Sequence, residues 1–460
     1  MFDFVRSSKF PYLSVFLVGV VLRGIPELLM SWYPVGYETI THYAPPIMTF
    51  PGRSLVDVFV EFLRAGPLFY VLMWFVANVT GAHAFVILKV VGPLLYGGLV
   101  VSFFVFLRRG LKFDGKMAFV ATLLLAFQVA ALRESWDRFM TMLGLIFLFC
   151  TFVVLKGNHK FKWWLVASLA VLTALSREYI AFVLFVAVLG FAVLEKKDRV
   201  ASLIALAPAI TFFSVTFYPR GVWENIVSDY LMVVSDAVLI FVICYLAILP
   251  FVLKGWHRNN LLDPMLGWLL LGSFSLVISP WLAVRSYARW LMLLVFPFSI
   301  YAAKGFERLQ LFSERRMRVL KAIVLVFLII GVGYSTSAFS YVGFATNSYV
   351  PANLMQSSID FDHVDDTIEC LRWLNSHAAK NSSLLAEERF HGWTQIYLEQ
   401  TNYNIKVIVY GANSLPTLAL ETALRDGFSL IYLIWYTDMS LKDFQVIHSQ
   451  NSVSLFQYVS

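Results

Sequence analysis

Residues 33–43 (YPVGYETITHY) place an acid, Glu38, one helical turn before a histidine, His42, immediately after a long apolar run. A proline and Gly36 predict a turn that holds Glu38 near a membrane surface. A carboxylate beside a partly apolar wall can be tuned to accept a proton near neutral pH, which is the task of a general base. Tyr37 and His42 are the side chains placed to support it. The alternative is that Glu38 only caps a short surface helix.

A second pair of acids lies in the polar break RESWDR at 133–138. If the neighbouring apolar runs cross a membrane, Glu134 and Asp137 face the same side of it as Glu38. The three carboxylates together offer the oxygen ligands that Mg²⁺ or Mn²⁺ prefers, and without a metal the latter two can orient a substrate. We expect Arg138 to orient Asp137 rather than to touch a substrate.

Arginines in two further breaks fit an anionic ligand. Arg285 and Arg289 are one turn apart and face the same way at the end of an apolar run, with Tyr287 between them. Guanidinium groups can grip two phosphate oxygens at once, so this pair suits a lipid phosphate at the membrane surface. Arg177 is a further phosphate candidate, and Glu178 beside it can simply pair with it. The alternative for these residues is a belt of aromatic anchors and snorkelling arginines.

The composition places these polar breaks in a membrane protein. Of the 460 residues, 59% are hydrophobic and only 14% are charged, whereas about 25% are charged in a typical soluble protein. This balance excludes a cytosolic enzyme, a disordered chain and a nucleic-acid-binding protein. The simplest interpretation of the net charge of +7 is that it comes from cytoplasmic loops, which are rich in Lys and Arg in membrane proteins. The three cysteines build neither a disulfide framework nor a CxxC metal site.

Apolar runs with short polar breaks predict an all-α polytopic bundle of about eleven transmembrane helices in residues 1–340. A further apolar run, 67–79, is short for a crossing and suits an interfacial or re-entrant helix within a long first outer loop, 31–83. The predicted spans are 12–30, 84–107, 117–132, 138–155, 163–175, 179–194, 200–217, 230–253, 264–280, 288–303 and 319–340.

The basic residues fix the expected orientation of the bundle. The breaks dense in Lys and Arg, which include 108–116 and 304–318, all fall on one side of the membrane in this count. Cytoplasmic loops carry this excess, so the N-terminus is expected inside the cell. The first outer loop and everything after residue 340 are then expected outside. Acids and arginines of the outer breaks converge on that outer face, and such charges at a bilayer edge point to a functional site.

The composition changes after about residue 341. Residues 363–377 place apolar side chains on one helical face, and 383–386, 406–410 and 430–434 are typical of short buried strands. The segments 392–400 and 416–426 between them can be helical. Alternation of strands and helices predicts a small extracytoplasmic α/β domain at 341–460 with a largely parallel sheet.

The order of the outer motifs resembles the GT-C superfamily of membrane glycosyltransferases. A first span, a turn with an acid, the segment GPLFYVL at 66–72 and a long span ending in Arg108 and Arg109 look most like the aminoarabinose transferase and protein O-mannosyltransferase branch. That branch has a double proline where this chain has Gly66 and Pro67, and its first acid is usually Asp where this chain has Glu38. Its second acid lies in the loop that here carries Glu134 and Asp137.

The resemblance implies transfer of a sugar from a polyprenyl- or dolichyl-phosphate-linked donor to an acceptor hydroxyl, with inversion, on the extracytoplasmic side. Glu38 would be the general base, Arg285 and Arg289 would hold the departing phosphate, and Glu134 and Asp137 would orient the acceptor or a metal. Relatives that transfer oligosaccharides use such a metal, whereas those that transfer single sugars mostly do not. The donor and membrane lipids are the expected partners, and the sequence identifies no acceptor.

Two alternatives stay open at this stage. A transporter or lipid flippase would place charges near the middle of the membrane, and Asp236, a turn into the 230–253 span, is the main residue of that kind. A non-catalytic scaffold would use the outer α/β domain to bind a partner, but it would not need the clustered outer acids.

Overall fold

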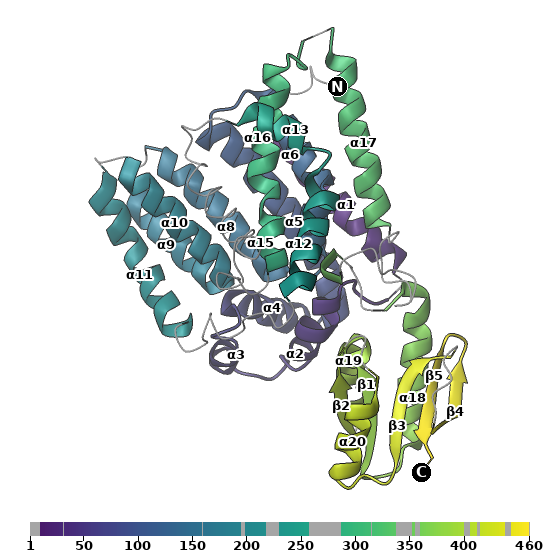
Figure 1. Cartoon of the computed structure of the whole chain (residues 1–460). Helices are drawn as coiled ribbons and strands as arrows, with labels where there is room; N and C mark the ends of the chain where they lie inside the picture. The colour runs from purple at the N-terminus through teal and green to yellow at the C-terminus, as the bar shows by residue number, and fades with distance from the viewer. Residues whose placement is uncertain are drawn as a thin grey trace.

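The computed structural model describes residues 10–30, 32–158, 160–194, 198–217, 230–256, 287–313, 315–336, 352–354, 359–399, 405–411, 415–437 and 443–459. A large helical bundle is followed by a small α/β domain that lies at one end of it (Figure 1). The short helices of the first loop lie at the same end of the bundle.

The bundle contains one helix, or a bent pair of helices, for every predicted span except 264–280, which lies outside the described residues. Its elements are α1 (Phe10–Leu29), α5 (Ala84–Val105), η3 (Phe106–Gly110), α6 (Gly115–Phe127), α7 (Val129–Asp137), α8 (Phe139–Lys156), α9 (Lys162–Ser176), α10 (Glu178–Leu194), α11 (Arg199–Phe217), α12 (Tyr230–Tyr245), α13 (Leu249–Gly255), α15 (Tyr287–Leu293), α16 (Val295–Arg308) and α17 (Met317–Ser335).

Several of these helices are long and apolar enough to cross a membrane. Within the described residues there are 6 of them, or up to 8 if each bent pair is one span. The sequence predicts about eleven, and the difference includes α9 and α10, which are apolar but shorter than a straight crossing needs. The described helices are therefore consistent with an integral multi-pass membrane protein.

The predicted span 117–132 is wrong as a single straight helix. It breaks at Gln128, whose backbone is extended (φ −72°, ψ 134°), and the axes of α6 and α7 differ by 61°. The residues 133–138, predicted as an outer polar break, belong mostly to α7, and every side chain of α7 is buried. Their charges are consequently inside the protein and need partners there.

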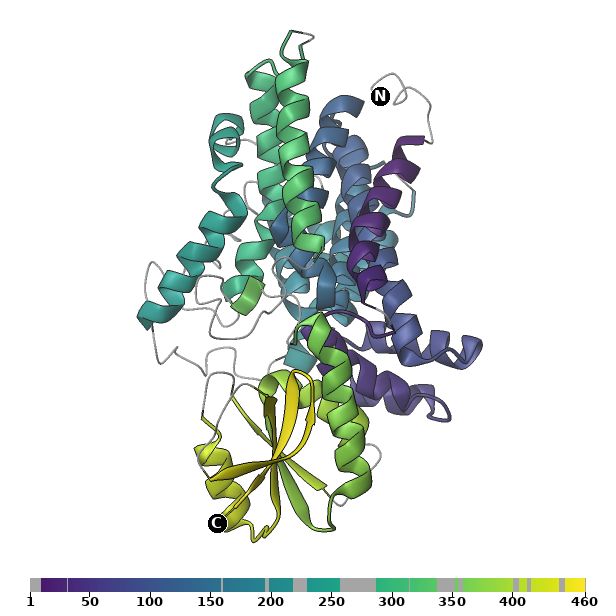
Figure 2. The same ribbon diagram turned by 90° about the vertical axis from the view of Figure 1, so that its right-hand side faces the viewer.

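The first loop forms short helices across the end of the bundle (Figures 1 and 2): η2 (Thr39–Tyr43), α2 (Ala44–Met48), α3 (Leu55–Glu61) and α4 (Pro67–Thr80). Gly66, with a left-handed backbone, and Pro67 at the first helical position start α4. Large apolar side chains of α3, among them Val56 and Val60, are exposed. An exposed apolar face on a short helix is typical of a helix lying in the membrane interface.

The α/β domain is a five-stranded sheet in the order β2-β1-β3-β5-β4. Strand β1 (Ser382–Glu387) is parallel to both β2 (Ile405–Tyr410) and β3 (Ile431–Tyr436), which confirms the three predicted strands. The hairpin of β4 (Phe444–Gln450) and β5 (Val453–Tyr458) pairs antiparallel to β3, so the sheet is mixed rather than largely parallel.

The helices of this domain lie on both sides of the sheet (Figure 2). The predicted helix at 363–377 is α18 (Val364–His377), and the predicted 416–426 is α20 (Thr417–Arg425). The segment after β1 is helical from its first residue, as α19 (Glu388–Thr394) and η9 (Gln395–Glu399). Helix α19 packs against η2 of the first loop, which joins the α/β domain to the bundle.

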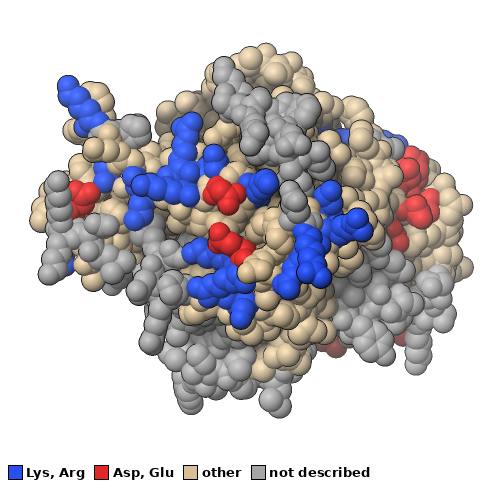
Figure 3. Space-filling model, turned by 90° about the horizontal axis from the view of Figure 1, so that it is seen from above, with Lys and Arg blue, Asp and Glu red and all other residues tan. Residues whose placement is uncertain are grey.

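Basic side chains gather at the end of the bundle opposite the α/β domain. Figure 3 shows this face, with many lysines and arginines and few acids. Arg108, Arg109, Lys112 and Arg316 belong to the exposed residues of the loops predicted to be cytoplasmic. The charge distribution agrees with the positive-inside orientation that the sequence predicts.

We predict that this basic end is cytoplasmic and that the α/β domain is extracytoplasmic. In intact cells, a membrane-impermeant maleimide should label Gln445→Cys on exposed strand β4 but label Ser313→Cys only after permeabilisation. The unmodified chain, whose native cysteines include the buried Cys244 and Cys370, is the control. Labelling of both introduced cysteines from the same side would contradict the orientation.

Candidate active site

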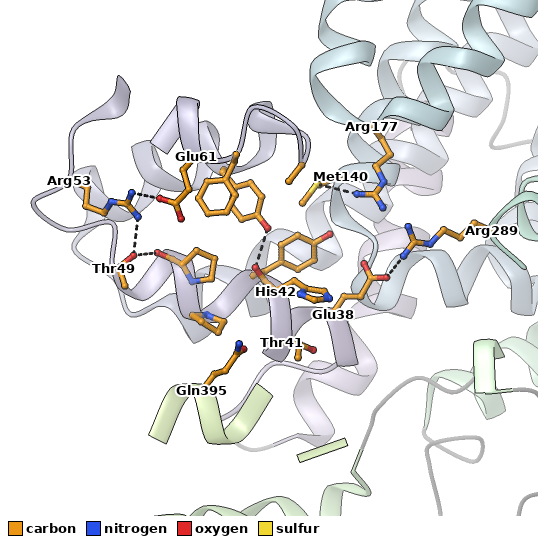
Figure 4. A pocket seen from close by; sticks show the side chains of 16 residues that line it. Glu38, Thr41, His42, Thr49, Arg53, Glu61, Met140, Arg177, Arg289 and Gln395 are labelled. Carbon is orange, nitrogen blue, oxygen red and sulfur yellow. Dashed lines mark hydrogen bonds and ion pairs between the residues drawn. The ribbon is translucent and has the colours of Figure 1, made fainter. Parts of the chain in front are cut away.

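A cavity of about 740 Å³ lies between the first loop, the bundle and the α/β domain (Figure 4). It collects Glu38 and His42 from the first loop, Arg177 from the junction of α9 and α10, Arg289 from α15 and Gln395 from η9. The structure therefore brings together four of the residues that the sequence singles out, from segments up to 251 positions apart.

The turn before Glu38 packs directly on the end of α7. Gly36 has a φ of +109°, and a Cβ there would lie 2.7 Å from the Cβ of Asp137 and 2.9 Å from the carbonyl oxygen of Trp136. The next polar contact follows at once, because the backbone N–H of Glu38 donates to Oδ2 of Asp137 at 3.3 Å. The turn needs glycine for both its backbone conformation and its close approach.

Charges buried in the bundle hold both partners of this contact in place. Arg23 donates from Nε and Nη2 to the carbonyl oxygens of Ser135 and Trp136 at 2.8 and 2.9 Å. It also pairs with Glu27 at 2.6 Å. Glu27 in turn accepts the N–H of Val35 at 3.2 Å. One buried ion pair therefore ties the end of α7 to the start of the first loop.

Lys89 secures the end of α1 in the same region. Its ammonium group donates to the carbonyl oxygens of Glu27, Met30 and Tyr33 at 2.5, 2.6 and 3.1 Å. Carbonyls at a helix end lack partners within the helix, and water is scarce in a membrane, so a cation is an effective substitute. The chain consequently leaves α1 in a fixed direction toward Glu38.

Glu38 forms an ion pair with Arg289, with 2.8 Å between Oε1 and Nη2. It lies at the start of η2, but its side chain makes no capping hydrogen bond, so the helix-cap alternative finds no support. Burial raises the pKa of Glu38, and the arginines, Arg289 first and then Arg138 and Arg177, more than reverse that effect. The pKa of Glu38 is therefore below its ordinary value, not tuned upward as the apolar wall alone would suggest.

Arg177 points into the same end of the cavity (Figure 4). Its Nη1 lies 3.7 Å from the sulfur of Met140, and its Nε lies 3.7 Å from Glu178. The predicted pairing with Glu178 is present, but it is long for a charge-assisted hydrogen bond. Within the described residues Arg177 therefore has hydrogen-bonding capacity left for an anion.

The acids Glu134 and Asp137 are structural rather than cavity-facing. Asp137 accepts from Arg133 at 2.5 Å, and Glu134 pairs with Arg138, so the expected partnership of Arg138 with Asp137 is wrong. Neither acid lines the cavity. Asp137 acts on Glu38 through the backbone contact.

The donor set for a metal does not assemble in the described part of the chain. No group of three or more His, Cys, Asp and Glu side chains could share an ion there. Glu134 and Asp137 each already hold an arginine, which does not fit the Mg²⁺ or Mn²⁺ site that Glu38, Glu134 and Asp137 suggested. We assign no step to a metal.

Two further predicted residues, Tyr37 and Tyr287, do not line the cavity. Tyr37 donates to Glu388 of the α/β domain at 3.1 Å, and burial together with that carboxylate raises its pKa. The hydroxyl of Tyr287 donates a hydrogen bond to Asp236 at 2.8 Å. Asp236 is the acid on which the transporter alternative depends, and it therefore already has a partner. Arg285 lies outside the described residues.

Sequence reasoning missed three kinds of contributor. Arg23 and Glu27 are charges four residues apart within an apolar span, and that spacing is a signal that could have revealed them. Tyr70 lines the cavity from α4 and donates to the carbonyl of His42 at 3.1 Å. Gln395 arrives from a different domain, and nothing in its local sequence marks it.

Fold and site together define a multi-helix membrane protein with a charged cavity beneath an α/β domain. No protein-family model matches the sequence, and no curated protein gives a significant match. The fold is similar to the cryo-EM structure of arabinofuranosyltransferase AftD from Mycobacteria, with a TM-score of 0.55 and 13% identity over 99% of this chain and 40% of that one. A mutant of that enzyme gives a TM-score of 0.53 and 11% identity over 99% and 42%.

The chain thus spans about 40% of the length of the arabinofuranosyltransferase it resembles. At this identity the likeness is one of fold and does not define the chemistry of the cavity.

We predict that Gly36→Ala lowers stability through both strain and a clash. Forcing a side chain into this conformation and space should cost about 2–5 kcal/mol, the sum of backbone strain and overpacking. Gly52→Ala is the matched control, because Gly52 also has positive φ (+84°) but open space around it, and should cost only about 1–2 kcal/mol. Thermal unfolding of both variants in one detergent checks this, and equal losses would contradict the close contact.

Proposed function

We propose that this protein is a membrane glycosyltransferase that moves a sugar from a polyprenyl- or dolichyl-phosphate-linked donor to an acceptor hydroxyl, with inversion. The observation that carries the proposal is the cavity at the end of the bundle, where the carboxylate of Glu38 meets the guanidinium groups of Arg289 and Arg177. The fold similarity to an arabinofuranosyltransferase and the resemblance of the outer motifs to the GT-C superfamily support the same conclusion.

The two arginines provide the leaving-group site. A lipid-linked phosphosugar carries its charge where the apolar tail meets the headgroup. Helix α3, which has an exposed apolar face, contributes Glu61 to the cavity lining. Within the described residues the polar contacts of Arg177 are long, and Arg289 can exchange its carboxylate partner for a phosphate oxygen. Together they stabilise the charge that develops on the departing lipid phosphate.

Glu38 is the general base. Its low pKa keeps it ionised at neutral pH, which a base requires, but it also makes the carboxylate a weak proton acceptor while Arg289 is bound to it. When the donor phosphate takes Arg289, Glu38 loses its closest positive charge and gains a nearby anion. Both changes raise its pKa. Donor binding therefore switches the base on.

The transfer step is then a direct displacement at the anomeric carbon. The acceptor hydroxyl gives its proton to Glu38 as its oxygen forms a bond to the anomeric carbon of the donor sugar. The bond between that carbon and the phosphate oxygen breaks, and the electron pair leaves with the lipid phosphate, held by Arg177 and Arg289. One displacement inverts the anomeric configuration.

We predict that Glu38→Gln loses about 10²–10⁴ in turnover, the usual contribution of a general base. Glu38→Asp should retain part of the activity, because the charge is kept one methylene further back. The assay is transfer from polyprenyl-phosphate sugars, beginning with arabinose, to octyl glycosides at saturating donor.

Glu369→Gln is the control for that assay, since Glu369 is an exposed partner of Arg372 in the α/β domain. Its turnover should match the unmodified protein. Near-normal turnover of Glu38→Gln would end the base assignment.

We predict that Arg177→Ala weakens binding of undecaprenyl phosphate by about ten- to a hundredfold, because a charge-assisted hydrogen bond contributes about 1.5–3 kcal/mol. Arg177→Lys should recover only part of the loss, since an ammonium group cannot grip two oxygens in a plane. Native mass spectrometry measures the binding, with Arg372→Ala as the control arginine. If Arg177→Ala binds as tightly as Arg372→Ala, Arg177 is an anchor and not a phosphate ligand.

A further inference from the structure

The α/β domain supplies one wall of the cavity. Gln395, the first residue of η9, points toward the cavity from below Thr41 and His42 (Figure 4). Its Oε1 is buried and has no hydrogen-bond partner in the described part of the chain. A buried carbonyl oxygen without a partner is destabilising, so an acceptor of this kind is a candidate for ligand binding.

The position of this wall is fixed from the side of the first loop. Gly392 lies so close to η2 that a Cβ would be 2.9 Å from Cγ2 of Ile40 and 3.0 Å from the backbone nitrogen of Thr41. Tyr37, next to the proposed base, donates to Glu388 at 3.1 Å. The ring of Trp393 packs edge-on against Tyr33 at 5.3 Å.

The same wall is fixed from within the α/β domain. Arg389 pairs with Glu387, the last residue of β1, and both side chains are buried. Strand β1 therefore helps to fix where α19 begins, and with it η9. A residue held from both sides can present its amide to a ligand with little loss of entropy on binding.

The chemistry around Gln395 fits a neutral, hydroxyl-rich ligand. The neighbouring lining consists of the apolar faces of Pro45 and Pro46 with the polar groups of Thr41 and His42. Glu38 and the two proposed phosphate arginines lie at another part of the lining, while Arg53 and Glu61, which also line the cavity, pair with each other (Figure 4).

We propose that Gln395 binds the acceptor, its amide oxygen accepting a hydrogen bond from a hydroxyl of a saccharide, so that the α/β domain helps to select the acceptor. The inference rests on the proposed function only in treating the bound saccharide as the acceptor. The binding site itself can be tested without any transfer reaction.

The test is direct binding of a panel of octyl mono- and disaccharide glycosides to the full chain in nanodiscs, without donor. Gln395→Ala should weaken the best-binding glycoside about fivefold, the usual contribution of one hydrogen bond. Gln395→Met keeps the length of the side chain without its amide and should lose as much, whereas a purely packing role would be preserved by Met. Gln445→Ala, a glutamine on exposed strand β4, should bind like the unmodified protein.

A second variant changes Gly392, which fixes the position of η9 against the first loop, rather than Gln395 itself. Gly392→Ala should weaken glycoside binding as well, because the added Cβ moves η9 away from the cavity, while binding of undecaprenyl phosphate in both variants stays within about twofold of normal. Unchanged glycoside binding in Gln395→Ala and Gln395→Met would overturn the inference. So would binding of a serine-containing peptide, but of no glycoside, by the unmodified protein.

These outcomes separate the inference from the proposed function. Glycoside binding that depends on Gln395, in a protein that transfers no sugar from any lipid-phosphate donor, would leave the site in place and remove the reaction. Transfer activity that depends on Glu38 but not on Gln395 would support the reaction and remove the proposed role of Gln395.

Discussion

The site depends on one contact, the packing of the Gly36 turn on the end of α7. There is no space for a side chain between Gly36 and Asp137, and the N–H of Glu38 is bonded to the Asp137 carboxylate. Arg23 holds the far side of the same helix end by two carbonyl oxygens. The base is therefore positioned by backbone and buried charge, which is more rigid than a loop held by surface contacts alone.

The electrostatics of the site follow from where its charges lie. In a membrane bundle each buried charge needs a partner, and the acids of α7 have theirs in Arg133 and Arg138. Among the charges that line the cavity, Arg53 pairs with Glu61, and Glu38 pairs with Arg289 close to Arg177. In the proposed reaction the donor phosphate competes with Glu38 for Arg289, so binding of the donor and activation of the base become one event.

The sequence predicts the bundle and the three parallel strands. It also predicts the convergence of Glu38, His42, Arg177 and Arg289, because charged residues between membrane-spanning runs must lie at the ends of the bundle. It does not predict the break at Gln128, since the residues on both sides are equally apolar. It also misses the β4–β5 hairpin, although the alternation at 444–458 around a turn at Asn451 is a usable signal. Gln395 reaches the cavity only through tertiary packing, which no local pattern encodes.

The most direct test of the exchange at Arg289 is the pH dependence of transfer. The acid limb of kcat/KM for the donor reports Glu38 in the free protein, where arginines hold its pKa below the ordinary value of 4.5. The acid limb of kcat reports the donor complex, where Arg289 is bound to phosphate and the pKa of Glu38 is raised. The account predicts that activity falls at a higher pH in kcat than in kcat/KM. Coincident limbs, or a kcat limb at lower pH, would contradict it.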